Sequence, residues 1–305
     1  MTTNNKEKEV ALDNDKTRSP AIWLDLELRE DIDDYLTLVY ALEQGVDVRC
    51  VSIHNPSVNE LKLLELTLNM FGSNADKVIS GEITKYPDAK DVHVSLLESI
   101  KNIVPTNVIP LTEYLDGYNK PTSSFFCGGS LHTLSKALAF VPDRHWEAYI
   151  QGGYAGPSIV GEENTLKKFR KREAVPTWNL NLDLSSTDYV MNAANLTATF
   201  ISKNICHDSW VHKNDINDND CVFNRVLSSY FKNNKWPDKC MHDLLAFLTI
   251  LDSDLVDFVP VTLSHGNEER PKWRSLKDLS SNKRISVSFD KVKFKKTITN
   301  YNALM

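Results

Sequence analysis

The chain has 305 residues, of which 25% are charged and 41% hydrophobic, a composition typical of one large globular domain or two small ones. Its formal net charge of -6 at pH 7 argues against extended nucleic acid as a partner and leaves open only a local basic patch. The five cysteines have no CxxC spacing, which disfavours a disulfide scaffold or a zinc knuckle and indicates a reducing, cytoplasmic compartment.

Residues 1–19 are polar and lack the apolar segment of a signal peptide. We therefore expect a loose tail followed by a single domain over residues 20–305. No apolar run reaches roughly 18 residues, so the sequence predicts no membrane-spanning helix and no membrane partner.

Strands and helices alternate along the predicted domain. Buried strands are predicted over residues 21–28, 46–55, 123–130, 145–153, 257–265 and 284–290. Helices are predicted over residues 33–45, 58–73, 131–141 and 240–252. This alternation predicts an α/β fold with an open, mostly parallel, doubly wound sheet flanked by helices.

Polar residues gather where the predicted strands end. Polar stretches lie at residues 54–56, 127–130 and 151–154, and an acidic run surrounds the end of the first strand. The acids of this run are Asp25, Glu27, Glu30, Asp31, Asp33 and Asp34. In doubly wound sheets, ligands bind at the carboxyl ends of the strands, near the switch in strand order. The sequence therefore predicts a ligand site at this edge of the sheet.

The acidic run has two interpretations. Carboxylates this close repel one another unless a cation or protons lie among them, which favours a metal site. Ca²⁺ takes about 6–8 oxygen ligands, so a distant acid should join, and Asp243 in the first turn of the helix 240–252 is the candidate. The alternative is a solvated turn that caps a helix.

Seven segments, taken together and in order, carry a family resemblance. They are IWLDLE with DIDDYLTLVYAL (22–42), VSIHN (51–55), GSLHTLSKAL (129–138), IQGGY (150–154), TWNLNLDLSST (177–187), HDLLAF (242–247) and Asp252. In this order they resemble the inosine-uridine-preferring nucleoside hydrolases, and the chain is similar to a divergent member of that family. The resemblance spans most of the chain and implies the nucleoside hydrolase-like fold.

The resemblance also implies a metal site and a catalytic pair. Asp34 and Asp243 would bind Ca²⁺, and Asp25 and a main-chain carbonyl near Gly128 would add to the metal shell. Glu27 stands where the family has an acid that binds Ca²⁺ and activates the attacking water. His242 stands where the family has a leaving-group acid or a His that contacts the base.

A ribose site follows from the same resemblance. Asp33, Asn55 and Asn179 would hold the ribose hydroxyls, and His54 would narrow the pocket or contact the substrate. The implied reaction is hydrolysis of an N-glycosidic bond through an oxocarbenium-like centre, with a carboxylate that accepts the proton of water. Family members are commonly dimers or tetramers, so the resemblance also implies a homo-oligomer that acts on a nucleoside or nucleotide.

The chain departs from the family pattern in two regions. The acidic motif has two extra residues between Glu27 and Asp33, and without this insertion the catalytic position would fall on Arg29. Thr177 stands where the family often has a Glu that contacts the sugar 5′-hydroxyl. The nearby segment LKKFRKRE (166–173) is basic. Thr and a basic loop would accept a phosphate, which leads to the hypothesis of a 5′-phosphorylated or modified substrate.

Several alternatives stay open at this stage. Asn55 could be a turn residue, His242 a helix cap, and Asn179 and Asn181 polar residues at a strand end. The basic segment could be a solvated surface. The whole chain could also bind a ribosyl ligand without hydrolysing it, or act on another ribosyl compound such as an ADP-ribose derivative.

Overall fold

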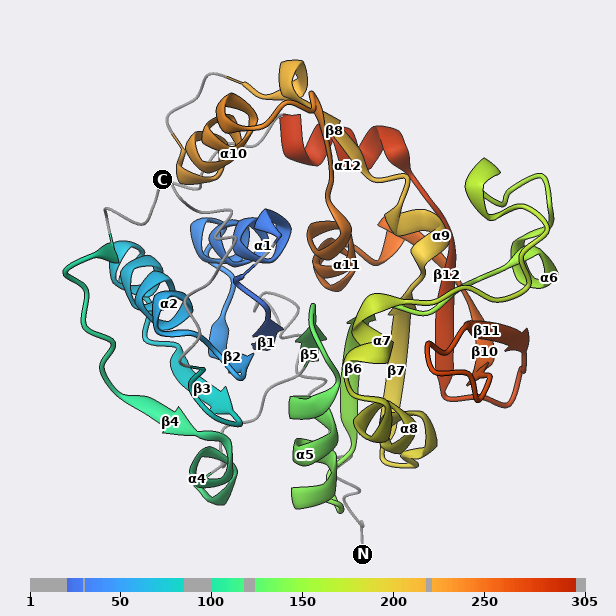
Figure 1. Cartoon of the computed structure of the whole chain (residues 1–305), viewed down its shortest axis with the longest axis horizontal. Helices are drawn as coiled ribbons and strands as arrows, with labels where there is room; N and C mark the ends of the chain where they lie inside the picture. Colours follow the sequence, from blue (N-terminus) through green and yellow to red (C-terminus); the bar gives the residue numbers. More distant parts are fainter. Residues whose placement is uncertain (1–20, 30, 85–99, 118–123, 218–220, 300–305) are drawn as a thin grey trace, which may run out of the picture.

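A ten-stranded sheet runs through the middle of the computed structural model, which describes residues 21–29, 31–84, 100–117, 124–217 and 221–299 (Figure 1). The strand order is β11-β10-β12-β7-β6-β5-β1-β2-β3-β4. Strand β10 is antiparallel to both of its neighbours, and the remaining pairings are parallel. The predicted fold class, an open and mostly parallel sheet, is therefore confirmed. The predicted tail, residues 1–19, lies outside the described residues.

The strands of the large sheet are short and come from the whole length of the chain. They are β1 (Ile22–Leu26), β2 (Val48–His54), β3 (Asp76–Ser80), β4 (Val108–Pro110), β5 (Ser124–Cys127), β6 (Trp146–Gln151), β7 (Leu196–Ile201), β10 (Val256–His265), β11 (Trp273–Lys277) and β12 (Lys283–Phe289). A second sheet of two antiparallel strands pairs β8 (Trp210–His212) with β9 (Asp238–Cys240). Strands β3, β4, β7 and β11 are absent from the prediction.

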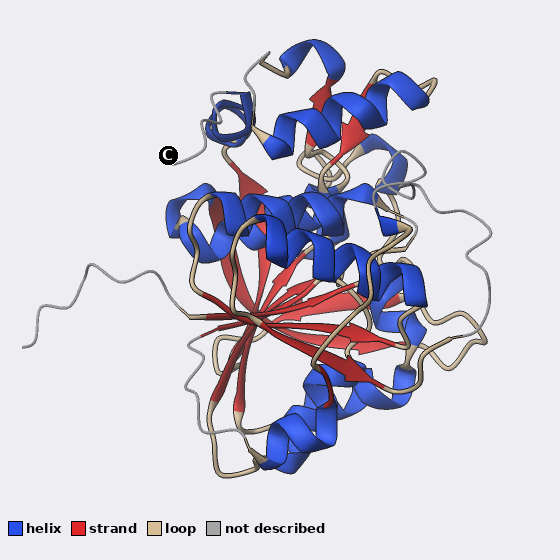
Figure 2. Cartoon of the chain, turned by 90° about the vertical axis from the view of Figure 1, so that its left-hand side faces the viewer, coloured by secondary structure: helices blue, strands red, loops and turns tan. Residues whose placement is uncertain are grey.

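Helices cover both faces of the large sheet (Figure 2). One face carries α1 (Ile32–Glu43), α2 (Val58–Met70), α10 (Val222–Asn233), α11 (His242–Leu251) and α12 (Lys291–Thr299). The other face carries α4 (Leu111–Asp116), α5 (His132–Phe140) and α8 (Leu184–Asn192). Shorter helices connect these elements: α6 (Pro157–Val160), α7 (Trp178–Leu182), α9 (Lys203–Cys206), and the 3₁₀ turns η1 (Lys167–Phe169), η2 (Lys213–Asp215) and η3 (Ser253–Leu255). Among the described residues, no helix has the length and apolar character needed to cross a bilayer.

Strand β1 shows how the sheet feeds two separate cores. Ile22, Leu24 and Leu26 pack into the core beneath α1 and α11, whereas Trp23 packs into the core on the opposite face. Successive side chains of a strand point to opposite faces, so a strand buried on both sides is apolar almost throughout. Asp25 is the exception in β1, and it is 2% exposed.

The strand order reverses between β1 and β5. From β1 the chain moves outward through β2, β3 and β4, and it then returns to place β5 on the other side of β1. The carboxyl ends of the parallel strands lie on one side of the sheet (Figure 2). The residues that follow β1 and β5 therefore meet at the switch point where such folds bind ligands.

Candidate active site

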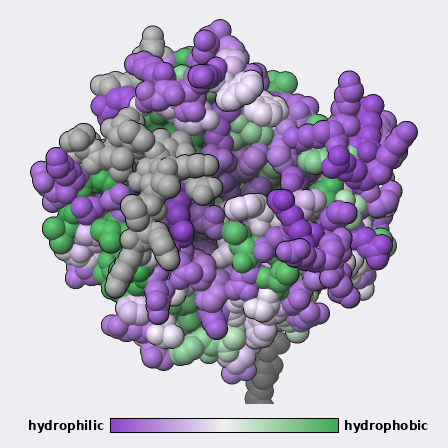
Figure 3. Space-filling model, viewed as in Figure 1, coloured by the Kyte–Doolittle hydropathy of each residue, from purple (hydrophilic) through white to green (hydrophobic). Residues whose placement is uncertain are grey.

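A cavity of about 740 Å³ opens at this switch point. Hydrophilic side chains dominate the face around it (Figure 3). Every site residue predicted from the sequence except Asp25 lines this cavity: Glu27, Asp33, Asp34, His54, Asn55, Gly128, Thr177, Asn179, His242 and Asp243. It also contains residues that the prediction does not name as site residues, including Arg29, Asp31, Ser130, Gln151, Lys203 and His207.

Three buried carboxylates meet at one side of the cavity. Asp33, Asp34 and Asp243 each offer a carboxylate oxygen, and these oxygens lie within 4.8 Å of one another. Asp33 and Asp34 lie in the first turn of α1, and Asp243 lies in the first turn of α11. Oδ2 of Asp33 accepts hydrogen bonds from the backbone N–H groups of His242 (2.8 Å) and Asp243 (3.2 Å). These bonds hold the starts of the two helices together and bring the acids into one cluster.

The cluster carries more negative charge than the protein neutralises. Burial, followed by repulsion from neighbouring carboxylates, raises the pKa values of Asp34 and Asp243 well above their usual range. Oδ1 of Asp33 and Oδ1 of Asp243 are buried and accept no hydrogen bond from the described residues. Carboxylate oxygens with free lone pairs in a buried, crowded cluster fit a hard divalent cation such as Ca²⁺.

Lys239 supplies one positive charge to this cluster. Its Nζ lies 2.7 Å from Oδ1 of Asp31 and 3.7 Å from Oδ1 of Asp33, and it donates a hydrogen bond of 2.6 Å to the Cys240 carbonyl. Although burial opposes ionisation, the charge of Lys239 and hydrogen bonds hold the pKa of Asp33 below its usual value. Lys239 is not among the residues predicted from the sequence. Asp34 and Asp243 form no ion pair with it in the described part of the chain, so room for a divalent cation remains.

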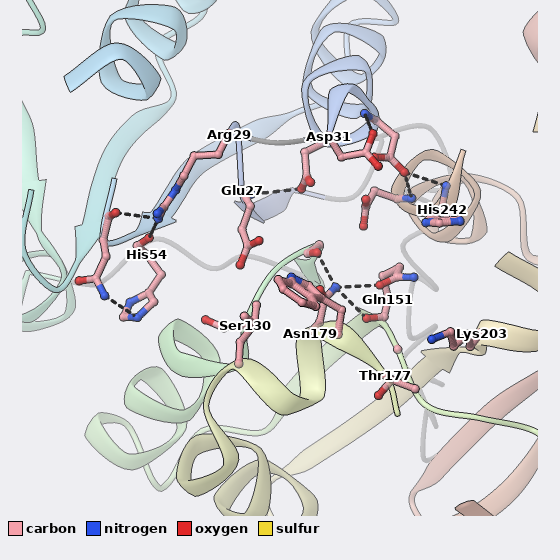
Figure 4. Close-up of a pocket in the computed structure, with 18 of the residues that line it drawn as sticks. Glu27, Arg29, Asp31, His54, Ser130, Gln151, Thr177, Asn179, Lys203 and His242 are labelled. Atoms are coloured by element: carbon pink, nitrogen blue, oxygen red, sulfur yellow. Dashed lines mark hydrogen bonds between the residues drawn. The ribbon is translucent and has the colours of Figure 1, made fainter. Parts of the chain in front are cut away.

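Glu27 and Asp25 lie in different surroundings. The backbone N–H of Glu27 donates to Oδ1 of Asp34 (3.1 Å), while the Glu27 carboxylate points into the cavity (Figure 4). Asp25 lies outside the cavity lining, where its Oδ1 accepts a hydrogen bond of 2.5 Å from Ser52 and its Oδ2 lies 3.8 Å from Sγ of Cys127. Burial raises the pKa of Asp25 to about 7. This placement differs from the predicted metal-ligand role, because groups within the sheet already hold the Asp25 carboxylate.

Asn179 connects the floor of the cavity to the end of β5. Its Nδ2 donates to the Gly128 carbonyl (2.6 Å) and to Oε1 of Gln151 (2.7 Å). Asn179 lies on α7, so the alternative that it ends a strand is wrong. A Cβ atom on Gly128 would lie 2.6 Å from Oδ1 of Asp34, which means that glycine lets the chain pass close to the acidic cluster.

His54 and Asn55 form a rigid corner at the end of β2. Nδ1 of His54 lies 2.7 Å from the Ser80 carbonyl, and its Nε2 lies 3.0 Å from Nδ2 of Asn55. The first contact requires a proton on Nδ1, so Nε2 accepts from the Asn55 amide. Oδ1 of Asn55 accepts from the backbone N–H of Glu82 (3.0 Å). These bonds use one of the two side-chain N–H groups of Asn55, so the other can contact a ligand.

His242 and His207 lie together at another side of the cavity. Their ring centroids are 4.9 Å apart, and Nε2 of His242 has no hydrogen-bond partner among the described residues. Burial lowers the pKa of His242 to about 4, so its imidazole is neutral at pH 7. His242 is the first residue of α11 and follows the N-cap Met241, which makes the helix-cap alternative wrong.

Comparisons with known proteins identify the fold. The sequence matches no family model. It is 25% identical over 247 residues to an uncharacterized protein of Aquifex aeolicus, which covers 74% of this chain and 80% of that protein. A plant nucleoside hydrolase superposes with a TM-score of 0.68 at 14% identity, covering 92% of this chain and 98% of that one. This chain has the nucleoside hydrolase fold.

Two further structures agree. The inosine-uridine-preferring nucleoside hydrolase of Bacillus anthracis has a TM-score of 0.64 at 11% identity, with 92% of this chain and 97% of that chain covered. A purine-preferring ribonucleoside hydrolase of Gardnerella vaginalis gives 0.62 at 14% identity, with 91% and 96% covered. The predicted structural resemblance is confirmed, and the low identities make the chain a divergent example of the nucleoside hydrolase fold.

The enlarged acidic loop is anchored within this nucleoside hydrolase fold. Nη2 of Arg29 donates to the backbone carbonyls of His54 (3.2 Å) and Asn55 (2.8 Å), and its Nε lies 3.1 Å from Oε2 of Glu60. Arg29 thus links the loop to the end of β2 and to Glu60, which belongs to the capping box at the start of α2. Arg29 therefore anchors the loop, and the catalytic role of Glu27 stays a prediction.

Proposed function

We propose that this protein hydrolyses the N-glycosidic bond of a nucleoside or of a 5′-phosphorylated or modified nucleotide, with Ca²⁺ as its cofactor. The observation that carries the proposal is the buried cluster of Asp33, Asp34 and Asp243, which faces Glu27 and Asn179 across one cavity at the switch point. A cavity of about 740 Å³ falls within the range that small-molecule sites usually occupy, roughly 300–1,000 Å³.

The donor set around the cluster fits Ca²⁺. Asp34 and Asp243 would hold the ion, with the main-chain carbonyl of Gly128 and the carboxylate of Glu27 as further oxygen ligands. Two buried oxygens of the cluster lack partners among the described residues, and filling them offsets the cost of burying charge. When bound, Ca²⁺ would lower the pKa of a water and orient the sugar hydroxyls.

Side chains of the protein would carry out proton transfer, ribose binding and contact with the base. Glu27 would accept a proton from the water that attacks the anomeric carbon. Asp33, Asn55 and Asn179 would hold the ribose hydroxyls. The neutral His242 carries an unpartnered ring nitrogen and would hydrogen-bond the departing base.

One observation favours a second function, a ribosyl-binding protein that does not hydrolyse its ligand. The carboxylate of Glu27 is not part of the cluster of acids within 4.8 Å of one another. A longer side chain placed outside the cluster would position water less well, and binding would survive without turnover.

A substrate panel separates the two functions. We expect purified protein with Ca²⁺ to release free base and the corresponding sugar or sugar phosphate from members of a panel of ribonucleosides, 2′-deoxyribonucleosides, their 5′-monophosphates and ADP-ribose. Base release that chelation abolishes and that Asp34→Ala lacks supports the hydrolase. Saturable binding of the same compounds without any base release supports the binding protein.

A further inference from the structure

We propose that the end of the cavity formed by Thr177, Lys203 and His207 is an anion subsite that binds a phosphate ester carried by the ribosyl substrate. This inference rests on the proposed function for the presence of the ribose, and it specifies the substrate class of that site. Thr177 precedes α7, Lys203 begins α9 and His207 follows α9, and Thr177 and Lys203 lie away from Asp31 at the start of α1 (Figure 4).

Lys203 places an ammonium group inside the cavity. It is the first residue of α9, separated from the end of β7 by Ser202, and its Nζ donates a hydrogen bond of 2.8 Å to the carbonyl of Pro176, the residue before Thr177. This bond fixes the charge beside the Thr177 side chain. Lys203 is half-buried, and burial together with the nearby charges of Lys168 and Arg270 lowers its pKa.

The positive charge around Lys203 is not balanced by the protein. Within the described ranges, no carboxylate lies within 4.0 Å of the charged groups of Lys203, Lys168 or Arg270. Three cations close enough to affect one another, one of them half-buried in a cavity, favour an anionic ligand.

Thr177 adds an independent observation. It is 3% exposed, it lines the cavity, and its Oγ1 has no hydrogen-bond partner among the described residues. A buried hydroxyl without a hydrogen-bond partner destabilises a fold. Such a group is explained if a ligand oxygen accepts its hydrogen bond, as a phosphate oxygen would.

His207 completes a set of three donors. Nζ of Lys168 lies 2.8 Å from Nδ1 of His207, and an ammonium can only donate. The imidazole is neutral, because burial, followed by the charges of His242 and Lys168, lowers its pKa to about 3. Its proton therefore lies on Nε2, which makes that atom a donor. An ammonium, a hydroxyl and a ring N–H suit the several acceptor oxygens of a phosphate better than the two of a carboxylate.

The acidic cluster and the Lys203 ammonium come from different elements around the cavity, and Arg29, which also lines it, is already paired with Glu60. The acidic cluster and Glu27 lie on the side of β1, α1 and α11, and Lys203 and Thr177 lie on the side of β7 and α7 (Figure 4). A substrate with polar hydroxyls in its middle and a phosphate at one end matches this arrangement. The structure thus favours a nucleotide, or another phosphorylated riboside, over an uncharged nucleoside.

Calorimetric titration of the Ca²⁺-loaded full chain with ribose 5-phosphate and with ribose tests the subsite without requiring hydrolysis. We expect ribose 5-phosphate to bind at least about tenfold more tightly than ribose, as one charge-assisted hydrogen bond would give. Lys203→Met and Thr177→Val should each remove roughly tenfold of this preference and change ribose affinity by less than about twofold. Lys277→Met, an exposed lysine on β11 outside the cavity lining, is the matched control and should leave the preference intact.

Thr177→Val keeps the test valid if Lys203→Met folds poorly, because the hydroxyl it removes has no hydrogen-bond partner in the described part of the chain. Equal affinity for the two sugars, no measurable binding of ribose 5-phosphate at millimolar concentration, or an equal loss for both sugars in the variants would overturn the subsite. Absence of hydrolysis for every substrate would overturn the proposed function and leave the binding preference unaffected, so the two failures are distinguishable.

Discussion

Nδ2 of Asn179 donates a hydrogen bond of 2.6 Å to the carbonyl oxygen of Gly128, and this bond joins α7 to the end of β5 beside the acidic cluster. Through it, the position of a substrate-facing side chain depends on the same backbone segment that borders the proposed metal site. A substitution of Asn179 or of Gly128 should therefore affect both the cavity wall and the proposed metal site.

Replacing Asn179 tests this connection. Asn179→Ala leaves the Gly128 carbonyl and Oε1 of Gln151 without their donor, so we expect a destabilisation of about 1–3 kcal/mol and a roughly tenfold higher KM. Asn181→Ala is the control, because Asn181 lies on the same helix, donates to the Pro271 carbonyl, accepts from Trp273, and lies outside the cavity lining. It should lower the melting temperature without raising KM. Equal KM increases in the two variants would contradict a direct role for Asn179.

Substitutions at two neighbouring glycines test the proposed metal binding and the proposed catalysis separately. A Cβ on Gly128 would lie 2.6 Å from Oδ1 of Asp34, whereas a Cβ on Gly129 would lie 2.7 Å from Cγ of Glu27. We expect Gly128→Ala to weaken Ca²⁺ binding by more than about tenfold. Gly129→Ala should weaken Ca²⁺ binding much less than Gly128→Ala and lower kcat more, since its Cβ displaces the Glu27 side chain and not Asp34. Calorimetry and steady-state kinetics on both proteins provide the check, and the reverse pattern would refute the assignment.

Removing one acid of the cluster should stabilise the metal-free protein. Asp34→Asn and Asp243→Asn each remove a buried charge that repels its neighbours, so their melting temperatures in chelator should exceed that of the wild type. Ca²⁺ should raise the melting temperature of the wild type and have little effect on the variants. A variant that keeps the full Ca²⁺-induced shift would show that its carboxylate does not hold the ion.

Glu27→Gln probes the proton acceptor. Gln keeps the length of the side chain and loses the basic carboxylate, so we expect kcat to fall by about 10²–10⁴ and the affinity for Ca²⁺ to fall much less. Wild-type kcat in Glu27→Gln would assign proton transfer to another group.

Asp25 predicts a pH dependence of stability. Its pKa rises from 3.8 in the unfolded chain to about 7 in the fold, so the folded state binds a proton that the unfolded state lacks between these values. Asp25 should therefore contribute a fall of at most about 4 kcal/mol in the free energy of unfolding between about pH 4 and 7, in addition to the falls that Asp34 and Asp243 cause. Asp25→Asn should flatten this decline and exceed the wild type at pH 8 in denaturant titrations. Asp254→Asn, an exposed substitution, should keep the wild-type profile.

The central strands can be predicted because each is a buried apolar run that ends in polar or glycine residues. Strands β1, β2, β5 and β6 all fit this description, and their ends also predict the edge on which the cavity lies. Strand β4 at the edge of the sheet has only three residues, and β3 beside it has only two apolar residues, Val78 and Ile79, so neither forms a long apolar run. Strand β7 mixes threonine with apolar residues and is likewise absent from the prediction.

The acids of the site can be predicted because several of them lie close together in the sequence. Its lysines are isolated in the sequence and are harder to predict. The sequence analysis assigns positive charge to residues 166–173, none of which lines the cavity. Lys203 is the lysine that lines the cavity, and Lys168 of that segment contacts His207 beside it. The signal of Lys203 is its place just after a central strand, the same signal that marks Asn55 and Gly128. Asn179 lies on a helix of only five residues, too short for helical periodicity to distinguish from a strand end.

The charge of the Lys239 side chain has a consequence for folding. Lys239 lies on β9, a few residues before α11, and pairs with Asp31 and Asp33 at the start of α1. The acidic residues consequently meet a positive charge as soon as α11 docks against α1, before any ion arrives from solution. With the proposed Ca²⁺ site, the two helices would therefore dock without the ion, and Ca²⁺ would bind to a chain that is already folded.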